Sequence, residues 1–302
     1  DSSVKAARKC FTKGYERIDQ ARDDIATQAA IEAAEFNNED PSDQPEVYGP
    51  YKQQVPPIDI MPTTGPGLIQ HINDIGDLEL SAGFLYSGEF SDELANNPDM
   101  LENIKILSEM YDTGDKEAKY TKGAEYRSKS IHGQPLSALL VGSPGHILYD
   151  EQTKKKFHVA FMSKLARRSW FCYTPERIPE HVFDSVDKML DYEEKLETEA
   201  KQARASMQEY VMKITTFGLS TSGKDISVSD EVTRLFKTYK RYNSDYADTL
   251  PNQDSTYALI RRHLQWKAIK LAGAFAIFDC SDSIEVKHYV EAMRFCELLD
   301  QD

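Results

Sequence analysis

Three acidic side chains follow a short apolar run in the first third of the chain. The run Ala82–Tyr86 is too short for a helix and predicts a buried β-strand, and a Ser-Gly pair ends it. Glu89, Asp92 and Glu93 come directly afterwards. Open α/β sheets place their chemistry at the carboxyl ends of strands, where an acid can hold Mg²⁺ or orient an attacking water. A plain helix start fits the same residues, because acidic side chains favour the first helical turn.

A second apolar run, Leu136–Val141, predicts another buried strand, which ends near Ser143. A small polar residue there, beside a strand that ends in carboxylates, fits a contact to the γ-phosphate of a nucleotide. An ordinary strand-to-helix turn fits it as well. Arg167 and Arg168 directly precede a further predicted strand, Ser169–Tyr173. They fit either a solvated sheet edge or cationic fingers that reach a neighbouring subunit's nucleotide.

The segment Gly218–Lys224 matches the phosphate-loop pattern G-x-x-x-x-G-K, but Asp225 follows where the pattern requires Ser or Thr. A phosphate loop also needs a helix that begins at its lysine. The sequence predicts an extended stretch over Lys213–Asp225. It then predicts a further extended run, Ile226–Val228, and a helix cap only at Ser229, so no helix begins at Lys224 and the context argues against a phosphate site.

The order of the predicted elements indicates two domains. Residues 1–174 alternate helical and strand patterns, which predicts a mainly parallel sheet covered by helices. From residue 180 onward the pattern is helical, and it is strongly charged between Asp191 and Arg204. We therefore predict an α/β core over residues 1–178 and a helical domain over residues 179–302.

The composition limits the possible partners. A net charge of −14 excludes a protein that coats nucleic acid over its whole surface, so any such contact must be local. Lys154, Lys155 and Lys156 form one candidate contact, and Lys240 and Arg241, which lie among tyrosines, form another. A solvated helix face accounts for both groups equally well.

The sequence has no apolar run long enough to span a membrane. Its four cysteines show no metal-ligand spacing, so we expect reduced thiols in a cytoplasmic protein. The chain does not begin with Met, and it opens with a helical pattern typical of the helix that follows a phosphate loop. We therefore expect the loop itself to lie upstream of Asp1.

Taken in order, these segments resemble the RecA-like ATPase domain of replicative helicases and primase-helicases encoded by phages and mobile elements. The resemblance is colinear over nearly the whole chain. The matching pieces are Gly83–Glu89, Tyr111–Asp115, Leu136–His146, Lys164–Phe171, Lys267–Ala276 and Val286–Leu299.

The resemblance implies roles for the residues at the two strand ends. Glu89 would polarise the attacking water, and Ser143 would sense the γ-phosphate. Gly88 stands where the family has an Asp that holds Mg²⁺. Asp92 or Glu93 would take that role if the strand ended later.

The resemblance also implies partners. Arg167 or Arg168 would act in trans, which requires a homo-oligomeric ring such as a hexamer. ATP and Mg²⁺ would be the cofactors, and single-stranded DNA would be the substrate of the motor, in the cytoplasm of a phage host. The alternative is a non-catalytic scaffold or assembly protein that keeps an α/β core and self-associates through its helices.

Overall fold

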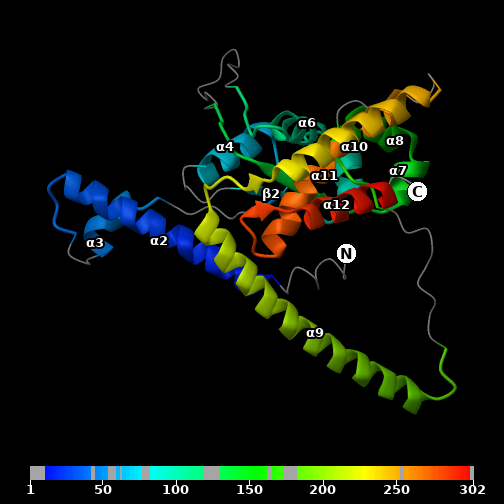
Figure 1. The fold of residues 1–302 in the computed structure, drawn as a ribbon. Helices are drawn as coiled ribbons and strands as arrows, with labels where there is room; N and C mark the ends of the chain where they lie inside the picture. The colour runs from blue at the N-terminus through cyan, green and yellow to red at the C-terminus, as the bar shows by residue number, and fades with distance from the viewer. Residues whose placement is uncertain are drawn as a thin grey trace. The chain divides into compact units, whose positions relative to one another are not determined.

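The computed structural model describes residues 11–41, 45–53, 59–61, 63–76, 82–117, 130–161, 165–172, 182–251 and 255–299. Within these ranges the protein is mostly helical, and its strands are only two to five residues long. The chain divides into two compact units. Figure 1 draws the helices and strands of the described residues as a ribbon. The first contains residues 18–169 and 242–263, and the second contains residues 11–17, 170–241 and 264–299 of the described chain. The predicted boundary after residue 178 lies outside the described residues and stays a prediction.

The predicted RecA-like, mainly parallel sheet is wrong. The largest sheet among the described residues has three parallel strands in the order β1-β2-β3. The predicted strand Ser169–Tyr173 is absent over residues 169–172, where Trp170 instead packs its ring edge-on against Phe295. The predicted extended stretch Lys213–Asp225 is helical as far as Thr221.

The first unit is built around this short sheet. β1 (Asp59–Ile60), β2 (Gly83–Ser87) and β3 (Leu136–Leu140) pair in parallel, with Ser87 aligned to Leu140. The helices that follow or connect the strands are α4 (Gly65–Gly76), α5 (Phe90–Asn96), α6 (Met100–Met110), α7 (Pro144–Tyr149) and α8 (Glu151–Ala160). The predicted strands near residues 82–86 and 136–141 are therefore confirmed as local elements, although the large sheet is not.

A cluster of large aliphatic side chains, here called the sheet core, fills the space between β1–β3 and the helices α4 and α6. Its buried members are Ile60, Leu68, Ile72, Ile75, Leu85, Ile106, Leu107, Met110, Ile131 and Leu136. A second cluster joins α5, α6 and α8 through members such as Phe90, Leu94 and Phe161. These contacts fix the carboxyl end of β2 against its neighbouring elements.

A glycine in the turn after α6 contacts the backbone of the segment that precedes β3. Gly114 has φ +71°, its amide donates to the Met110 carbonyl at 3.0 Å, and its carbonyl accepts the Gln134 amide at 3.1 Å. A Cβ at this position would lie 2.5 Å from the Gln134 backbone. Only glycine combines this left-handed conformation with so close an approach.

The remaining elements are mainly long helices. They are α2 (Thr12–Phe36), α3 (Pro45–Tyr48), η1 (Gly49–Tyr51), η3 (Ala166–Arg168), α9 (Val186–Thr221), β4 (Ser227–Val228), α10 (Asp230–Thr249), α11 (Ser255–Phe278), β5 (Ser283–Ile284) and α12 (Val286–Leu299). The helical pattern predicted from residue 180 onward is confirmed at α11 and α12. No helix of the described chain is both long and apolar enough to cross a bilayer.

Residues from α10, α11, β5 and α12 form a third apolar cluster, which lies within the second unit and is here called the helical core. Its buried members are Val232, Tyr239, Leu264, Ala268, Ala272, Ala276, Ile284, Tyr289, Ala292 and Cys296. The alanines at 268, 272 and 276 recur every fourth residue and so share one face of α11. The short parallel pair β4–β5 aligns Val228 with Ile284.

Candidate functional site at the carboxyl edge of the sheet

The structure brings Glu89 and the backbone of Ser143 to the same edge of the sheet. β2 and β3 run in parallel and end at Ser87 and Leu140, so the residues that follow both strands leave from one edge. Hydrogen bonds continue the pairing beyond the strands, because the Val141 amide donates to the Ser87 carbonyl at 2.8 Å. The Phe90 amide returns a 2.8 Å bond to the Val141 carbonyl.

Glu89 occupies the N-cap position of α5, but its side chain makes no capping hydrogen bond. Its side chain is exposed. Asp92, also exposed, and half-buried Glu93 lie in the first turn of α5, and Glu93 accepts a hydrogen bond from the Asn97 amide group at 3.0 Å. Glu93 therefore has a partner on its own helix, whereas the exposed Glu89 carboxylate does not cap α5.

Two serines and a glycine hold this edge together, and sequence reasoning missed their roles. The Ser91 hydroxyl donates to the Ser143 carbonyl at 2.8 Å, which ties α5 to the segment after β3. A Cβ on Gly142 would lie 2.3 Å from the Ser91 hydroxyl oxygen, so the two segments touch without room for a side chain. The hydroxyl of Ser87 is buried and has no hydrogen-bond partner among the described residues. In the sequence, only the small residues that follow each strand could have predicted these contacts.

Arg167 and Arg168 are engaged within the first unit. Arg168 forms an ion pair with Asp112, donates to the Ser108 carbonyl at 3.1 Å and lies 5.3 Å from the centre of the Tyr111 ring. These partners lie at the C-terminal end of α6, where a cation is favoured by the helix dipole. Arg167 lies 3.3 Å from the imidazole of His263. Both side chains therefore stabilise this unit, and neither is free as an extended finger.

The predicted cluster on α8 separates into different surroundings. Lys156 donates to the carbonyls of Leu94 and Ala95 at 3.0 and 2.7 Å, so it caps the C-terminus of α5. Lys154 and Lys155 are exposed, and Lys154 lies 3.5 Å from Glu151 on the same helix. Of the three lysines, only Lys154 and Lys155 are exposed to a polyanion.

The second basic group lies on α10. Lys240 and Arg241 are exposed, as is Tyr242. Tyr239 instead enters the helical core, where its hydroxyl donates to Glu297 at 2.7 Å. One of the two tyrosines that interrupt the basic run is therefore unable to stack on a nucleic-acid base.

The segment that matches the phosphate-loop pattern is the C-terminal end of α9. Gly218 lies inside the helix, Gly223 follows it with φ +72°, and the Lys224 amine donates to the Ser220 carbonyl at 2.9 Å. A phosphate needs the amide groups at the opposite end of a helix. The sequence-based rejection of this segment is confirmed, although the extended backbone expected there is wrong.

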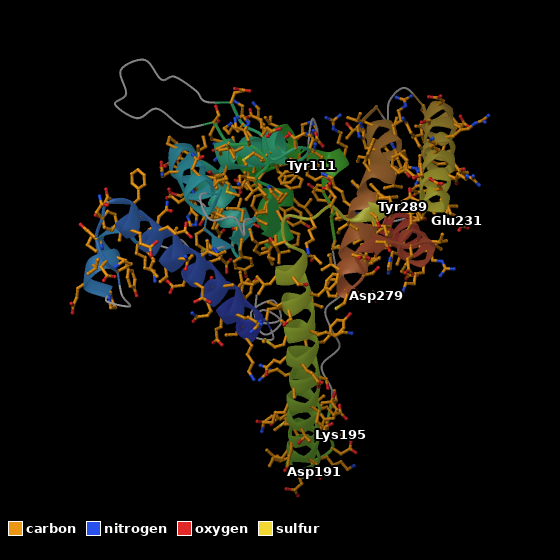
Figure 2. The ribbon with its side chains drawn as sticks, turned by 60° about the vertical axis from the view of Figure 1, so that its left-hand side comes forward. Tyr111, Asp191, Lys195, Glu231, Asp279 and Tyr289 are labelled. Atoms are coloured by element: carbon orange, nitrogen blue, oxygen red, sulfur yellow. The ribbon has the colours of Figure 1, made fainter. Side chains whose placement is uncertain are left out.

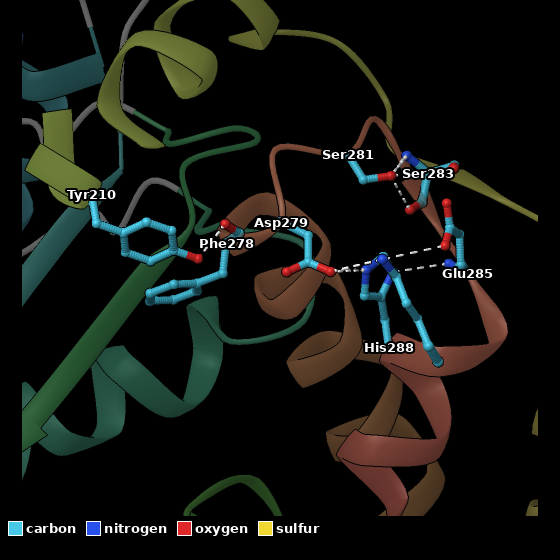
Figure 3. A network of polar contacts seen from close by, with 8 residues as sticks. Tyr210, Phe278, Asp279, Ser281, Ser283, Glu285 and His288 are labelled. Carbon is cyan, nitrogen blue, oxygen red and sulfur yellow. Dashed lines mark hydrogen bonds and ion pairs between the residues drawn. The ribbon is translucent and has the colours of Figure 1, made fainter. Parts of the chain in front are cut away.

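A His–Asp pair at the turn between α11 and α12 resembles a catalytic dyad but is structural (Figure 3). His288 Nδ1 accepts the Glu285 amide at 3.0 Å, so its Nε2 carries the proton and donates to Asp279 at 3.1 Å. The carboxylate also pairs with Lys287 at 2.9 Å, and this bond, followed by that of His288, lowers the pKa of Asp279. Figure 2 shows Asp279 at this turn and Tyr289 on α12. Because both imidazole nitrogens are engaged, His288 has no free lone pair with which to act as a base.

No three His, Cys, Asp or Glu side chains in the described part of the chain lie close enough together to hold a metal ion. Comparison with known proteins leaves the site to be interpreted from its geometry, since neither a protein-family model nor a curated protein matches this chain.

Proposed function

We propose that this chain belongs to an ATP-hydrolysing motor that acts on single-stranded DNA, with hydrolysis at the carboxyl edge of β2 and β3. The observation that carries the proposal is that Glu89 and the Ser143 backbone leave the sheet at one edge, joined by the Ser91–Ser143 hydrogen bond. The proposal needs only two adjacent parallel strands and does not depend on a large sheet.

In this proposal Glu89 orients the attacking water, since its carboxylate is exposed and not used as a helix cap. Ser143 contacts the γ-phosphate. Mg²⁺ in nucleotide sites commonly takes one or two carboxylates together with phosphate oxygens, and Asp92 lies in the next turn for that role. Lys154, Lys155, Lys240 and Arg241 supply the exposed cations for a local contact to DNA.

The experiment measures phosphate release from MgATP by the 302-residue chain, with and without single-stranded DNA, for the wild type and for Glu89→Gln. Loss of a general base lowers turnover by about 10²–10⁴-fold, and nucleotide binding should persist. The matched control is Glu35→Gln, the same change at an exposed position of α2, which should leave turnover close to that of the wild type. Undiminished turnover in Glu89→Gln, or a wild type that neither binds nor hydrolyses ATP, refutes the proposal.

A non-catalytic assembly protein is the second candidate. One observation favours it: most of helix α9 is exposed on all sides, although it carries regularly spaced apolar residues. A wild-type chain that self-associates but has no nucleotide chemistry would support this candidate over the first.

A further inference from the structure

Helix α9 lacks the packing that normally stabilises a long helix. It contains 36 residues, which corresponds to about 54 Å. Its side chains from 186 to 207 are all exposed except for Tyr192, which is half-buried, and Val211 is the buried residue of the helix. Helical propensity alone gives marginal stability in water, and most helices are stabilised by a covered apolar face. The exposed part of α9 therefore calls for a partner.

The sequence of α9 specifies what kind of partner fits. Alternating steps of three and four residues from Val186 to Phe217 select V, M, E, L, A, A, M, Y, I and F. Nine of these ten are apolar, and the exception is Glu193. Heptad spacing of this kind produces a narrow seam that packs against a second helix with the same spacing. The seam is open at Leu196 and Met207, which are both 44% exposed.

Charge is distributed unevenly along the same helix. Residues 186–199 contain six acidic and two basic side chains, a net charge of −4, whereas residues 200–221 contain three basic and one acidic, a net charge of +2. Figure 2 shows Asp191 and Lys195 on the acidic half. Two parallel copies would bring acidic half against acidic half. Two antiparallel copies bring each acidic half against a basic half.

We propose that α9 pairs in antiparallel orientation with α9 of a second copy of this chain, with the two-fold axis between Ala200 and Ala203. The two alanines then face each other across the axis and allow the helices to approach closely. Leu196 packs against Met207 of the second copy, and Glu197 faces Arg204 of the second copy. This inference goes beyond the nucleotide site and does not depend on it.

Glu193 selects this arrangement over the alternatives. In a parallel pair in register, Glu193 would face Glu193 of the second copy inside the seam, which is unfavourable. In the antiparallel pair it lies beside Tyr210 of the second copy, one turn from Lys213. Sliding the antiparallel pair by one heptad in either direction places Glu197 or Arg204 opposite its own counterpart. With the axis between Ala200 and Ala203, each Glu197 instead faces an Arg204, so like charges do not meet.

The existing contacts of these residues leave room for the partner. Glu197 accepts an ion pair from Lys201 of its own helix at 2.8 Å, and its side chain is still 68% exposed, so its second oxygen is available. The Tyr210 hydroxyl donates to the Phe278 carbonyl at 2.6 Å, which fixes its ring while leaving 37% of the residue exposed (Figure 3).

The test measures the oligomeric state of the full chain by sedimentation equilibrium between about 1 and 100 µM. The wild type should form a dimer. Arg204→Glu should raise its dissociation constant at least about tenfold, because two like-charge contacts replace two ion pairs. Glu197→Arg should do the same. The double variant, which restores opposite charges only in the antiparallel register, should return to within about threefold of the wild type.

The matched control is Thr198→Asp, which adds a charge on the outer face of the same turn and should leave the dimer unchanged. Circular dichroism confirms that each variant keeps its helix content. A monomeric wild type at every concentration overturns the proposal. An assembly that ignores Arg204→Glu, or a double variant that stays as weak as the single ones, overturns it as well.

Discussion

The sheet core and the helical core are built from buried side chains of different size. Every buried member of the sheet core is Ile, Leu or Met. The buried members of the helical core include four alanines and two tyrosines. Parallel strands separate their covering helices by a full layer of side chains, which large aliphatic groups fill. Helices that pack directly on one another approach more closely when small residues lie at the contact.

Polar groups are buried in both units. In the helical core the Tyr239 hydroxyl reaches Glu297, while the Tyr289 hydroxyl is buried without a partner among the described residues. Burial raises the pKa of Tyr289. In the first unit the fully buried Asn103 of α6 donates to the Thr63 carbonyl at 2.7 Å. The two cores therefore differ in the size of their apolar side chains, and not in whether polar groups are buried near them.

The largest effect is expected from removing volume in the sheet core. Leu85→Ala on β2 deletes a fully buried side chain at the centre of the sheet and should cost about 2–5 kcal/mol of unfolding free energy. Urea denaturation measures it. The control is Leu148→Ala, because Leu148 is 51% exposed and should change stability by no more than about 0.5 kcal/mol. A loss below about 1 kcal/mol in Leu85→Ala would contradict the importance of volume there.

Adding volume should be the damaging change in the helical core. Ala272→Leu places three more carbon atoms on the closely packed face of α11, where Ala272 is fully buried, and should cost about 1–3 kcal/mol. The same substitution at exposed Ala205 on α9 is the control and should be neutral or slightly favourable, since leucine and alanine are both good helix formers. Equal stability of the two variants would mean that α11 tolerates wider spacing than its alanines indicate.

The smallest effect is a pH dependence confined to the helical core. The pKa of Asp279 is lowered by its bonds to Lys287 and His288, so its contribution is complete above its ordinary pKa near 4 and is lost as the pH falls through the lower, folded value. Asp279→Asn lacks this contribution at every pH. The difference between the unfolding midpoints of the two proteins should therefore shrink as the pH is lowered from 5 to 2.

Asp282→Asn is the matched control for that measurement, because Asp282 is exposed and lies at the same turn. The gap between this variant and the wild type gives the effect of removing a carboxylate from this turn without breaking the contacts to Lys287 and His288. A constant gap between wild type and Asp279→Asn down to the lowest pH would refute the role of the Asp279 contacts.

The fold was predictable where a single period dominates the sequence. The sequence predicted β2, β3, α11 and α12, because the spacing of the apolar residues in each follows one backbone geometry. It did not predict that the C-terminal end of α9 is helical. Thr215, Thr216 and Phe217 favour strands locally, yet Val211 and Thr215 lie where Gly14 of α2 leaves no room for a Cβ. Tertiary packing overrides the local preference there.

The candidate site was predictable as a pair of strand ends but not as a set of contacts. Glu89 and Ser143 could be assigned from the runs that precede them. The partners of Arg167 and Arg168 lie 56 to 96 residues away along the chain, at Asp112, Ser108 and His263. Contacts between residues so far apart in the sequence leave no local pattern. The sequence therefore did not predict the partners that both arginines have in the structure.

The hydrogen bonds at the turn between α11 and α12 have a consequence for how the chain folds. They link residues within ten positions of one another, from Asp279 to His288. The pairing of β2 with β3 must instead close a loop of more than fifty residues. Since closing a longer loop costs more entropy and local contacts form faster, the α11–α12 hairpin should assemble early and the sheet late. The nucleotide edge proposed here would then be among the last features of the molecule to form.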